Sequence, residues 1–208
     1  MKPSDALIIF ARNPVRGKVK TRLAATVGTE TAYEAYKCLL AHTHRATQNY
    51  PADKIVYYAD HVASGDLWDK GYRKALQRGA DLGERMQHAF AEVLGKGYPK
   101  AVLIGTDCPS LHESILREAF EGLENHDVVI GPAYDGGYYL IGMRAPRPSL
   151  FQGIAWSTAT VFKKTTAICR QSGLRYAVLP QLHDIDEEKD LVHLWSALSS
   201  QHIMSPYR

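Results

Sequence analysis

The first apolar run of this chain and the loop after it, ALIIFARNPVRGKVKTRLA at residues 6–24, constrain the fold most strongly. Residues 6–10 are continuously apolar, which is typical of a strand buried inside a parallel sheet. Open α/β sheets bind ligands in the loops at the carboxyl ends of their strands. This loop turns at Pro14 and Gly17 and carries five cations with no acidic residue among them: Arg12, Arg16, Lys18, Lys20 and Arg22. The segment therefore predicts a polyanion site, most simply for nucleotide phosphates.

The same cations are also compatible with a solvated surface loop or a patch for nucleic acid. A net charge of +3 is too small to indicate nucleic-acid binding by overall electrostatics. Neither G-x-x-x-x-G-K-[ST] nor G-x-G-x-x-G occurs in the loop, so the two common phosphate motifs are absent. No stretch approaches the ~20 apolar residues of a membrane span. The three scattered cysteines indicate neither a disulfide framework nor a zinc site, and we expect a cytoplasmic protein.

Short apolar runs alternate with amphipathic segments through the 208 residues. The runs predict strands at 55–59, 101–105, 127–131, 138–143 and 176–179. Helices are predicted at 29–49, 66–76, 82–94, 115–123, 157–171 and 187–199, with Ser157 as an N-cap. This alternation predicts a mainly parallel α/β sheet, in one domain over residues 1–208. The link between residues 131 and 138 is too short for a helical crossover, which indicates that one of those two strands runs antiparallel.

Acidic residues follow two of the predicted strands. Asp107 in GTDCPSL comes directly after the 101–105 run, as a turn or helix-capping residue or as a ligand for a hard cation such as Mg²⁺. Asp184 and Asp186 in HDIDEEKDL precede the last predicted helix, and alternation places both on one face of an extended segment. Asp186 is a candidate helix cap as well as a candidate metal ligand.

Three further segments carry candidate binding residues. In GPAYDGGYYLIGM, Asp135, Gly136 and Gly137 read either as a hairpin turn or as a close approach to an acceptor molecule. Gln77 leads into the 82–94 helix and is a candidate for contacting a base edge. Trp156 is interpreted as a core residue or as a wall of the acceptor pocket.

Taken together, FARNPVRGKVKTRLA, GTDCPSL, GPAYDGGYYLIGM and HDIDEEKDL resemble, in order and spacing, an uncharacterised bacterial transferase-like family. That family belongs to the nucleotide-diphospho-sugar transferase superfamily, which has the GT-A fold. The chain is also similar to phospholactate guanylyltransferase and to molybdenum-cofactor guanylyltransferase. The resemblance implies a three-layer α/β/α sandwich with a mixed, mainly parallel sheet. It also implies that the first loop holds nucleotide phosphates and that Asp107 and Asp186, or Asp184 in its place, bind Mg²⁺ or Mn²⁺.

The sequence departs from that pattern at two points. Ala11-Arg12 replaces the glycine pair that opens many nucleotidyltransferase loops, and Asp107 is not part of the Asp-x-Asp of glycosyltransferases. Our leading hypothesis is a metal-dependent nucleotidyltransferase that moves a nucleotidyl group from an NTP to a small, phosphorylated or hydroxyl-bearing acceptor and releases pyrophosphate. The alternatives are a glycosyltransferase with a nucleotide-sugar donor and a non-catalytic nucleotide sensor.

Roles follow from that hypothesis. Phosphate binding falls to the first loop and Gln77 contacts the base, whereas Asp135, Gly136, Gly137 and Trp156 line the acceptor side. The expected catalytic residues are Lys20, Asp107 and Asp135. The expected partners are an NTP or nucleotide sugar and a small-molecule acceptor, without nucleic acid.

Overall fold

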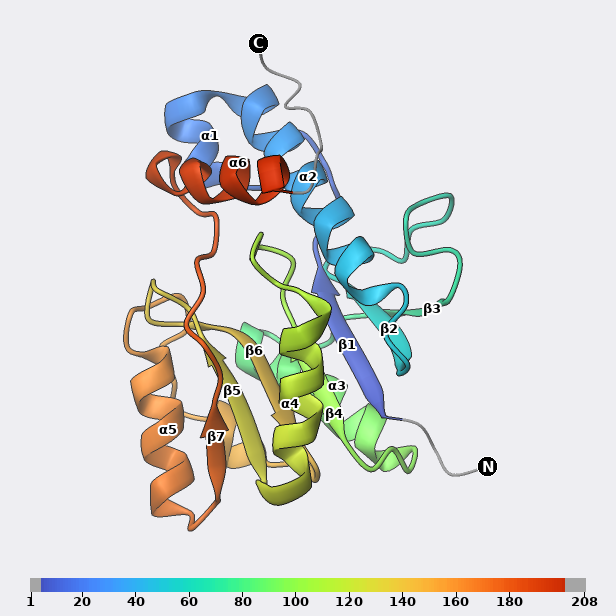
Figure 1. Ribbon diagram of the computed structural model, residues 1–208, viewed down its shortest axis with the longest axis vertical. Helices are drawn as coiled ribbons and strands as arrows, with labels where there is room; N and C mark the ends of the chain where they lie inside the picture. Colours follow the sequence, from blue (N-terminus) through green and yellow to red (C-terminus); the bar gives the residue numbers. More distant parts are fainter. Residues whose placement is uncertain (1–4, 201–208) are drawn as a thin grey trace.

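The computed structural model describes residues 5–200, and Figure 1 shows a single twisted sheet covered by helices. The sheet has seven strands in the order β3-β2-β1-β4-β6-β5-β7. The strands are β1 (Ala6–Ala11), β2 (Asp53–Tyr58), β3 (Tyr72–Leu76), β4 (Ala101–Ile104), β5 (Val128–Pro132), β6 (Tyr138–Met143) and β7 (Tyr176–Val178). Only β6 runs against its neighbours β4 and β5, and the remaining strand pairs are parallel. The prediction that the 131–138 link reverses the chain is confirmed.

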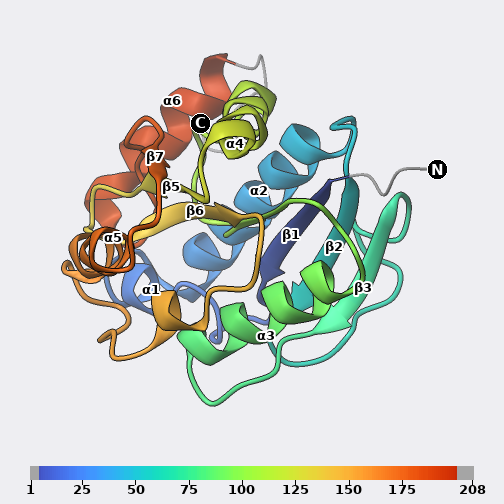
Figure 2. The ribbon, with the colours of Figure 1, turned by 90° about the horizontal axis from the view of Figure 1, so that it is seen from below.

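The helices form two layers on the sheet. They are α1 (Thr21–Val27), α2 (Thr29–Thr47), α3 (Leu82–Gly95), α4 (Glu113–Asn125), α5 (Val161–Gln171) and α6 (Leu191–Ser200), with short 3-10 turns η1 (Pro148–Phe151) and η2 (Glu188–Asp190). One core lies between the sheet and α2 and α4, and the other between the sheet and α3 and α5. Figure 2 shows these helices on the two sides of the sheet. Alternate residues of each strand supply the two cores, for example Leu7 and Ile8. The predicted three-layer α/β/α architecture is confirmed.

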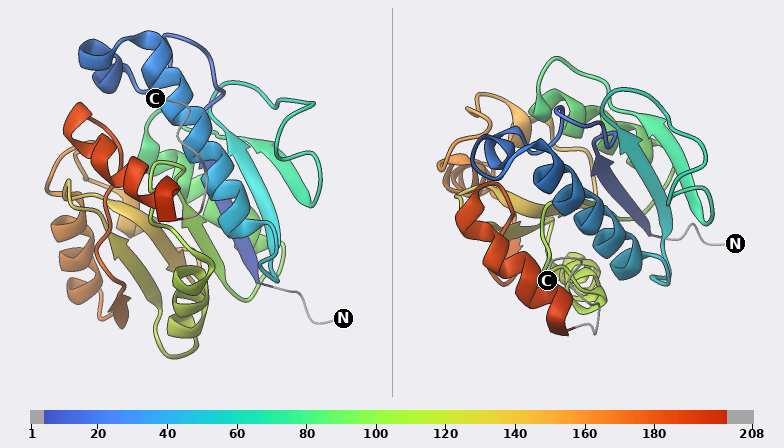
Figure 3. Two further views of the ribbon diagram at one scale, coloured as in Figure 1. Left: turned by 45° about the horizontal axis from the view of Figure 1, so that its top comes forward. Right: turned by 90° about the horizontal axis from the view of Figure 1, so that it is seen from above.

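A third, smaller core lies beyond the sheet. Leu23 of α1, Leu39 of α2 and Leu194 of α6 pack together there with Ile185, and each of these side chains is fully buried. Figure 3 shows α6, in red, beside the blue helices α1 and α2. This small core joins α1 and α2 to α6, the last helix that the structure describes.

Two local predictions were wrong. Residues 72–76 form the edge strand β3 rather than part of a helix, because they pair in parallel with β2 over five residues. The helix predicted from Ser157 begins only at Val161. Ser157 has a left-handed backbone with φ of 61°, and the start of α5 is fixed to the β5–β6 turn by a 2.9 Å hydrogen bond from Phe162 N to Gly136 O.

The strand directions decide where loops gather. Six strands end at one edge of the sheet, and the antiparallel β6 begins at that edge. The loops after β1, β4, β5 and β7 therefore converge, which is where ligands of open α/β sheets bind. Between residues 5 and 200, no helix is long and apolar enough to cross a membrane.

Candidate active site

A cleft of about 1110 Å³ opens at this edge of the sheet. The cationic loop after β1 lies on its lining together with the loop after β4, the β5–β6 turn and the segment between β7 and η2. Most of the residues predicted from the sequence line it: Arg12, Lys20, Arg22, Gln77, Asp107, Asp135, Gly137, Trp156, Asp184 and Asp186. Four motifs that are distant in sequence thus share one cavity.

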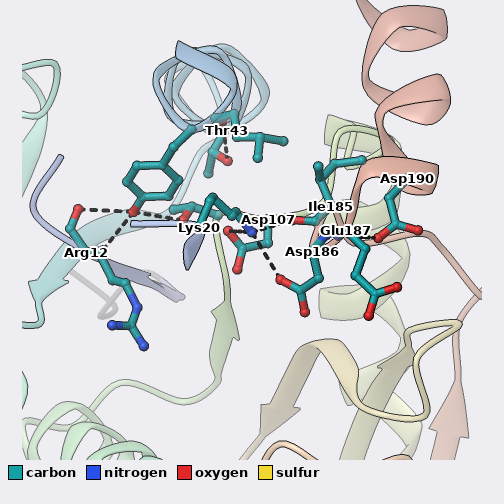
Figure 4. A network of polar contacts seen from close by, with 11 residues as sticks. Arg12, Lys20, Thr43, Asp107, Ile185, Asp186, Glu187 and Asp190 are labelled. Atoms are coloured by element: carbon teal, nitrogen blue, oxygen red, sulfur yellow. Dashed lines mark hydrogen bonds and ion pairs between the residues drawn. The ribbon is translucent and has the colours of Figure 1, made fainter. Parts of the chain in front are cut away.

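Lys20 lies at the centre of the polar network in this cleft (Figure 4). Its ammonium group is 2.8 Å from Asp107 Oδ1 and 3.4 Å from Asp186 Oδ1, and it donates a 2.6 Å hydrogen bond to the Ile185 carbonyl oxygen. The Lys20 side chain is only 5% exposed, against 43% for Asp107 and 41% for Asp186. Burial opposes the charge of Lys20, but the two carboxylates outweigh it and raise the pKa of the ammonium group. Lys20 is therefore a permanently charged group at the base of the cleft.

Neither acidic ligand candidate is used as a helix cap. The turn η2 is capped by a reciprocal pair in which Glu187 accepts from the Asp190 backbone and Asp190 accepts from the backbone N–H groups of Asp186 and Glu187. The carboxylate of Asp186 is consequently free to face Lys20. Asp107 likewise does not cap α4, whose N-cap residue is His112. The helix-capping interpretation of both aspartates is thus wrong: Glu187 and Asp190 cap η2, and the N-cap position of α4 is His112, which makes no side-chain cap hydrogen bond.

Ile185 fixes the acidic segment from both sides. Its side chain is fully buried in the small core, and its N–H donates a 2.9 Å hydrogen bond to the Asp107 carbonyl oxygen. Alternation then directs the flanking Asp184 and Asp186 side chains to the cleft, as the sequence pattern predicts. The backbone link between 185 and 107 holds the two acidic segments at a constant separation.

Asp184 is the most perturbed acidic group in the site. Its Oδ1 atom is buried and has no hydrogen-bond partner. Burial, with the nearby charges of Asp107 and Asp135, raises the pKa of Asp184 to about 8. The raised pKa means that the protein's own cations do not fully offset the negative charge of the ionised Asp184 carboxylate. An additional cation in the cleft would stabilise that ionised form.

Tyr36 of α2 fixes the start of the cationic loop. Its hydroxyl accepts a 2.9 Å hydrogen bond from the Arg12 N–H and donates one of 3.0 Å to the Arg12 carbonyl oxygen. The same hydroxyl is 3.4 Å from the Thr106 hydroxyl, directly before Asp107. Burial raises the pKa of Tyr36, so the phenol remains a neutral hydrogen-bonding group. One side chain thereby aligns the loop after β1 with the loop after β4.

Two of the predicted phosphate-binding residues lie outside the cleft lining. Arg16 is paired with Glu30, with Nε 2.9 Å from Oε2, and its guanidinium lies over the Tyr33 ring at 4.3 Å. Gly17 turns the loop with a φ of 76°. A third, Gln77, does line the cleft, but its amide N–H donates a 2.9 Å hydrogen bond to the Tyr57 carbonyl oxygen. The geometry therefore brings Arg12, Lys18, Lys20 and Arg22 onto the cleft lining.

The predicted acceptor side is built around the β5–β6 turn. Asp135 Oδ1 accepts a 2.8 Å hydrogen bond from Gly137 N, and Gly136 has a φ of 89°. A Cβ at Gly136 would lie 2.3 Å from the Ala159 carbonyl oxygen, so only glycine fits between the turn and the segment before α5. Trp156 packs against Gly83 and lines the same wall of the cleft. Gly136 itself supports this wall from behind rather than lining the cleft.

A family model described as "Uncharacterized protein conserved in bacteria (DUF2064)" matches residues 41–158, more than half of the sequence. The chain belongs to the DUF2064 family. No curated protein matches it. The loop of Lys20 and the segment of Asp186 lie outside the matched residues of the DUF2064 protein, so the site draws on both the matched part and its flanks.

Solved structures extend this result to the fold. A protein from Desulfovibrio desulfuricans G20, provisionally assigned as a nucleotide-diphospho-sugar transferase, is 33% identical with a TM-score of 0.86 over 96% of this chain and 90% of that one. The inositol-1-phosphate CTP transferase from T. maritima is 13% identical, with a TM-score of 0.57 over 99% and 100% of the two chains. Rv0371c from Mycobacterium tuberculosis H37Rv, in a complex with manganese, is 16% identical with a TM-score of 0.53 over 94% and 100%. The expected superfamily is confirmed for this DUF2064 protein.

One aromatic feature of the DUF2064 protein has no signal in its sequence. Tyr134, His183 and His193 stack in a row, with ring centroids 3.9 Å and 3.7 Å apart, and all three line the cleft. They come from the β5–β6 turn, the acidic segment and α6, so no spacing in the sequence connects them. Tyr36 was missed for a similar reason, since a buried helical tyrosine reads as an ordinary core residue.

Proposed function

We propose that this protein is a Mg²⁺- or Mn²⁺-dependent nucleotidyltransferase that transfers a nucleotidyl group from an NTP to a small acceptor and releases pyrophosphate. The coarser class, a transferase of the nucleotide-diphospho-sugar transferase superfamily, follows from the family, the fold and the 33% identical relative. The observation that carries the finer proposal is the buried ammonium of Lys20, held between Asp107 and Asp186 in a cleft with further cations on the same loop. The proposal treats residues 1–208 as one domain.

The cations of the first loop are the proposed phosphate ligands. Arg12, Lys20 and Arg22 would neutralise the triphosphate and then the pyrophosphate that leaves. Nucleotidyl transfer needs the α-phosphorus, the attacking oxygen and the leaving oxygen held in line, with charge compensation, and it needs no protein nucleophile. The site fits a reaction without a protein nucleophile, because the thiol of Cys108, beside Asp107, is buried and its pKa is raised.

The carboxylates of the cleft fit a divalent cation that is completed by the substrate. Within residues 5–200, no three His, Cys, Asp or Glu side chains stand together as a ready metal cage. Mg²⁺ typically takes one or two protein carboxylates and completes its shell with waters and phosphate oxygens. Asp107 and Asp186 would supply those carboxylates, and the unpartnered Oδ1 of Asp184 lies in the same pocket lining. A bound cation would polarise the phosphate chain and offset its negative charge.

The turn after β5 is the proposed acceptor side. Asp135, Gly137 and Trp156 lie on the cleft lining together with residues of the cationic loop. Asp135 would orient the attacking oxygen, because it is the carboxylate of this turn and Gly137 N already fixes its rotamer. The acceptor would therefore be a small molecule with a hydroxyl or phosphate oxygen as its attacking atom.

A glycosyltransferase with a nucleotide-sugar donor is the second candidate. The provisional assignment of the 33% identical Desulfovibrio protein favours it. The same cations and carboxylates would then hold the diphosphate of the donor. The released product separates the two, because nucleotidyl transfer from an NTP releases pyrophosphate and glycosyl transfer releases a nucleoside diphosphate or monophosphate.

Thermal denaturation with Mg²⁺ and each of ATP, GTP, CTP, UTP, UDP-glucose and GDP-mannose is the first experiment. A ligand at 100 times its Kd stabilises by about 2.7 kcal/mol, a readily measured rise in Tm. A metal-dependent rise in Tm with one NTP supports the proposal if this rise is lost at high salt in Lys20→Ala and retained in Arg16→Ala. Arg16 is the matched control because it is a cation of the same loop that lies outside the cleft. A shift with a nucleotide sugar alone would favour glycosyl transfer, and binding without turnover that survives Asp107→Ala would indicate a sensor.

A further inference from the structure

The surroundings of Lys20 suggest a second role for this side chain. An ammonium group has three N–H donors, and three oxygens lie within reach of Nζ: those of Ile185, Asp107 and Asp186, at 2.6, 2.8 and 3.4 Å. The side chain is 5% exposed, so these oxygens have replaced its water shell. Lys20 is thus fully committed within the protein and has no donor left for a phosphate.

The charge balance around Lys20 is incomplete. One ammonium group faces the two carboxylates of Asp107 and Asp186, at 2.8 and 3.4 Å. Beside them, the buried Oδ1 of Asp184 has no hydrogen-bond partner. A divalent cation would compensate both negative charges, where the lysine compensates one. Charge compensation therefore favours the exchange of the lysine for such a cation at these carboxylates.

We infer that Lys20 is an internal counter-ion that occupies the oxygens of Asp107 and Asp186 until a divalent cation displaces it. This inference rests on the proposed function for the nature of the cation and of the nucleotide. Ammonium and divalent cation need the same carboxylate oxygens, so the two exclude each other. Displacement frees the three donors of Lys20, which then become available to the phosphates of the nucleotide that accompanies the cation.

The local backbone permits this exchange without a change of fold. The Lys20 carbonyl accepts a 2.8 Å hydrogen bond from Ala24 N in the first turn of α1, which holds the main chain in place. Asp107 is held by the hydrogen bond from Ile185 N to its carbonyl oxygen. Only the side-chain torsions of Lys20 need to change, whereas the two carboxylates remain where they are.

Amine labelling of the unmodified protein tests the inference directly. The full-length protein is treated with an N-hydroxysuccinimide ester, with EDTA or with saturating Mn²⁺, and the acylation of each lysine is read by mass spectrometry. We expect Lys20 to be protected in EDTA and to be acylated at least about tenfold faster with Mn²⁺. Lys163, exposed and outside the cleft lining, is the internal control and should react equally in both conditions.

Mn²⁺ affinity provides the second readout and does not depend on turnover. Lys20→Met should bind Mn²⁺ at least about tenfold more tightly than the wild type without nucleotide, equivalent to about 1.4 kcal/mol. Arg16→Met removes a positive charge from the same loop outside the cleft lining and should leave the affinity within about twofold. Lys20→Arg keeps the charge and should not gain affinity. Free Mn²⁺ is measured by electron paramagnetic resonance.

The outcomes separate this inference from the proposed function. If Mn²⁺ binds while Lys20 stays protected, or if Lys20→Met gains no affinity, displacement is refuted and the transferase proposal stands. If Mn²⁺ releases Lys20 but none of the four NTPs protects it again, displacement stands and the NTP assignment fails. If no Mn²⁺ binds with or without NTP, the carboxylates are not a cation site and both proposals fail.

Discussion

The Tyr36 hydroxyl offers the most direct test of how the two site loops are held together. We expect Tyr36→Phe to weaken NTP binding as well as stability, because this hydroxyl joins both backbone groups of Arg12 to Thr106 beside Asp107. The ring itself is fully buried, and phenylalanine keeps its packing. The variant therefore removes hydrogen bonds without opening a cavity around the ring.

The magnitude follows from the groups left behind. A buried hydrogen bond contributes about 1 kcal/mol net, and an unsatisfied buried partner costs about 1–3 kcal/mol. The Arg12 backbone groups are left without their partner but lie beside an exposed side chain, where water reaches them. We therefore expect a loss of about 1–2 kcal/mol in the free energy of unfolding. Release of the loop should also lower NTP affinity about tenfold, the equivalent of about 1.4 kcal/mol.

Tyr72→Phe is the matched control. Its hydroxyl is also buried and hydrogen-bonded, 2.7 Å from Thr47 Oγ1 at the far end of α2, but Tyr72 does not line the cleft. Urea denaturation of both variants should give similar losses of stability. Titration with the NTP that stabilises the wild type should separate them, with reduced affinity only in Tyr36→Phe. Equal NTP affinities in the two variants would refute the positioning role and leave Tyr36 as a core residue.

Three further results are expected. Asp107→Asn should abolish turnover in a pyrophosphate-release assay, yet leave the protein folded by circular dichroism, because the amide keeps an oxygen acceptor for Lys20 and Asp186 remains as its counter-ion. Because burial and nearby carboxylates raise the pKa of Asp184 from 3.8 to about 8, the folded protein keeps a proton that the unfolded chain releases. Stability in EDTA should fall as pH rises from about 4 to 8, and an equally steep fall in Asp184→Asn would contradict this. Gly83→Ala should lower the free energy of unfolding by about 1–3 kcal/mol and shift tryptophan emission, because its Cβ would lie 2.5 Å from Trp156 Nε1. Gly95→Ala on the same helix is the control, since its Cβ meets nothing within 4 Å. Unchanged emission in Gly83→Ala would show that Trp156 is not displaced.

The strands and most helices of this protein follow from its sequence because their apolar periodicity is strong. The 138–143 run coincides with β6, and the short link before it correctly indicated a reversal. The edge strand β3 was not predictable in this way, since YRKAL has no clear alternation and is a strand only through its pairing with β2. Local propensity was overridden there by a tertiary contact.

The members of the site were easier to predict than their contacts. Asp107 and Lys20 stand out in the sequence because each follows an apolar strand in an expected loop. That the two form an ion pair was not predictable, because no local pattern reports a contact between residues 87 positions apart. The same limit applies to Arg16: sequence places it in the cationic loop, and only the structure shows its pairing with Glu30.

The burial of Ile185 in the small core has a consequence for synthesis of the chain. By the time β6 has been made, a nascent polypeptide already carries the cationic loop and Asp107, but Ile185 and Asp186 are still to come. The acidic segment docks only when Ile185 enters the core of α1, α2 and α6, 165 residues after Lys20. Because protein synthesis proceeds from the N-terminus, the site is assembled last, and an unfinished chain holds only half of it.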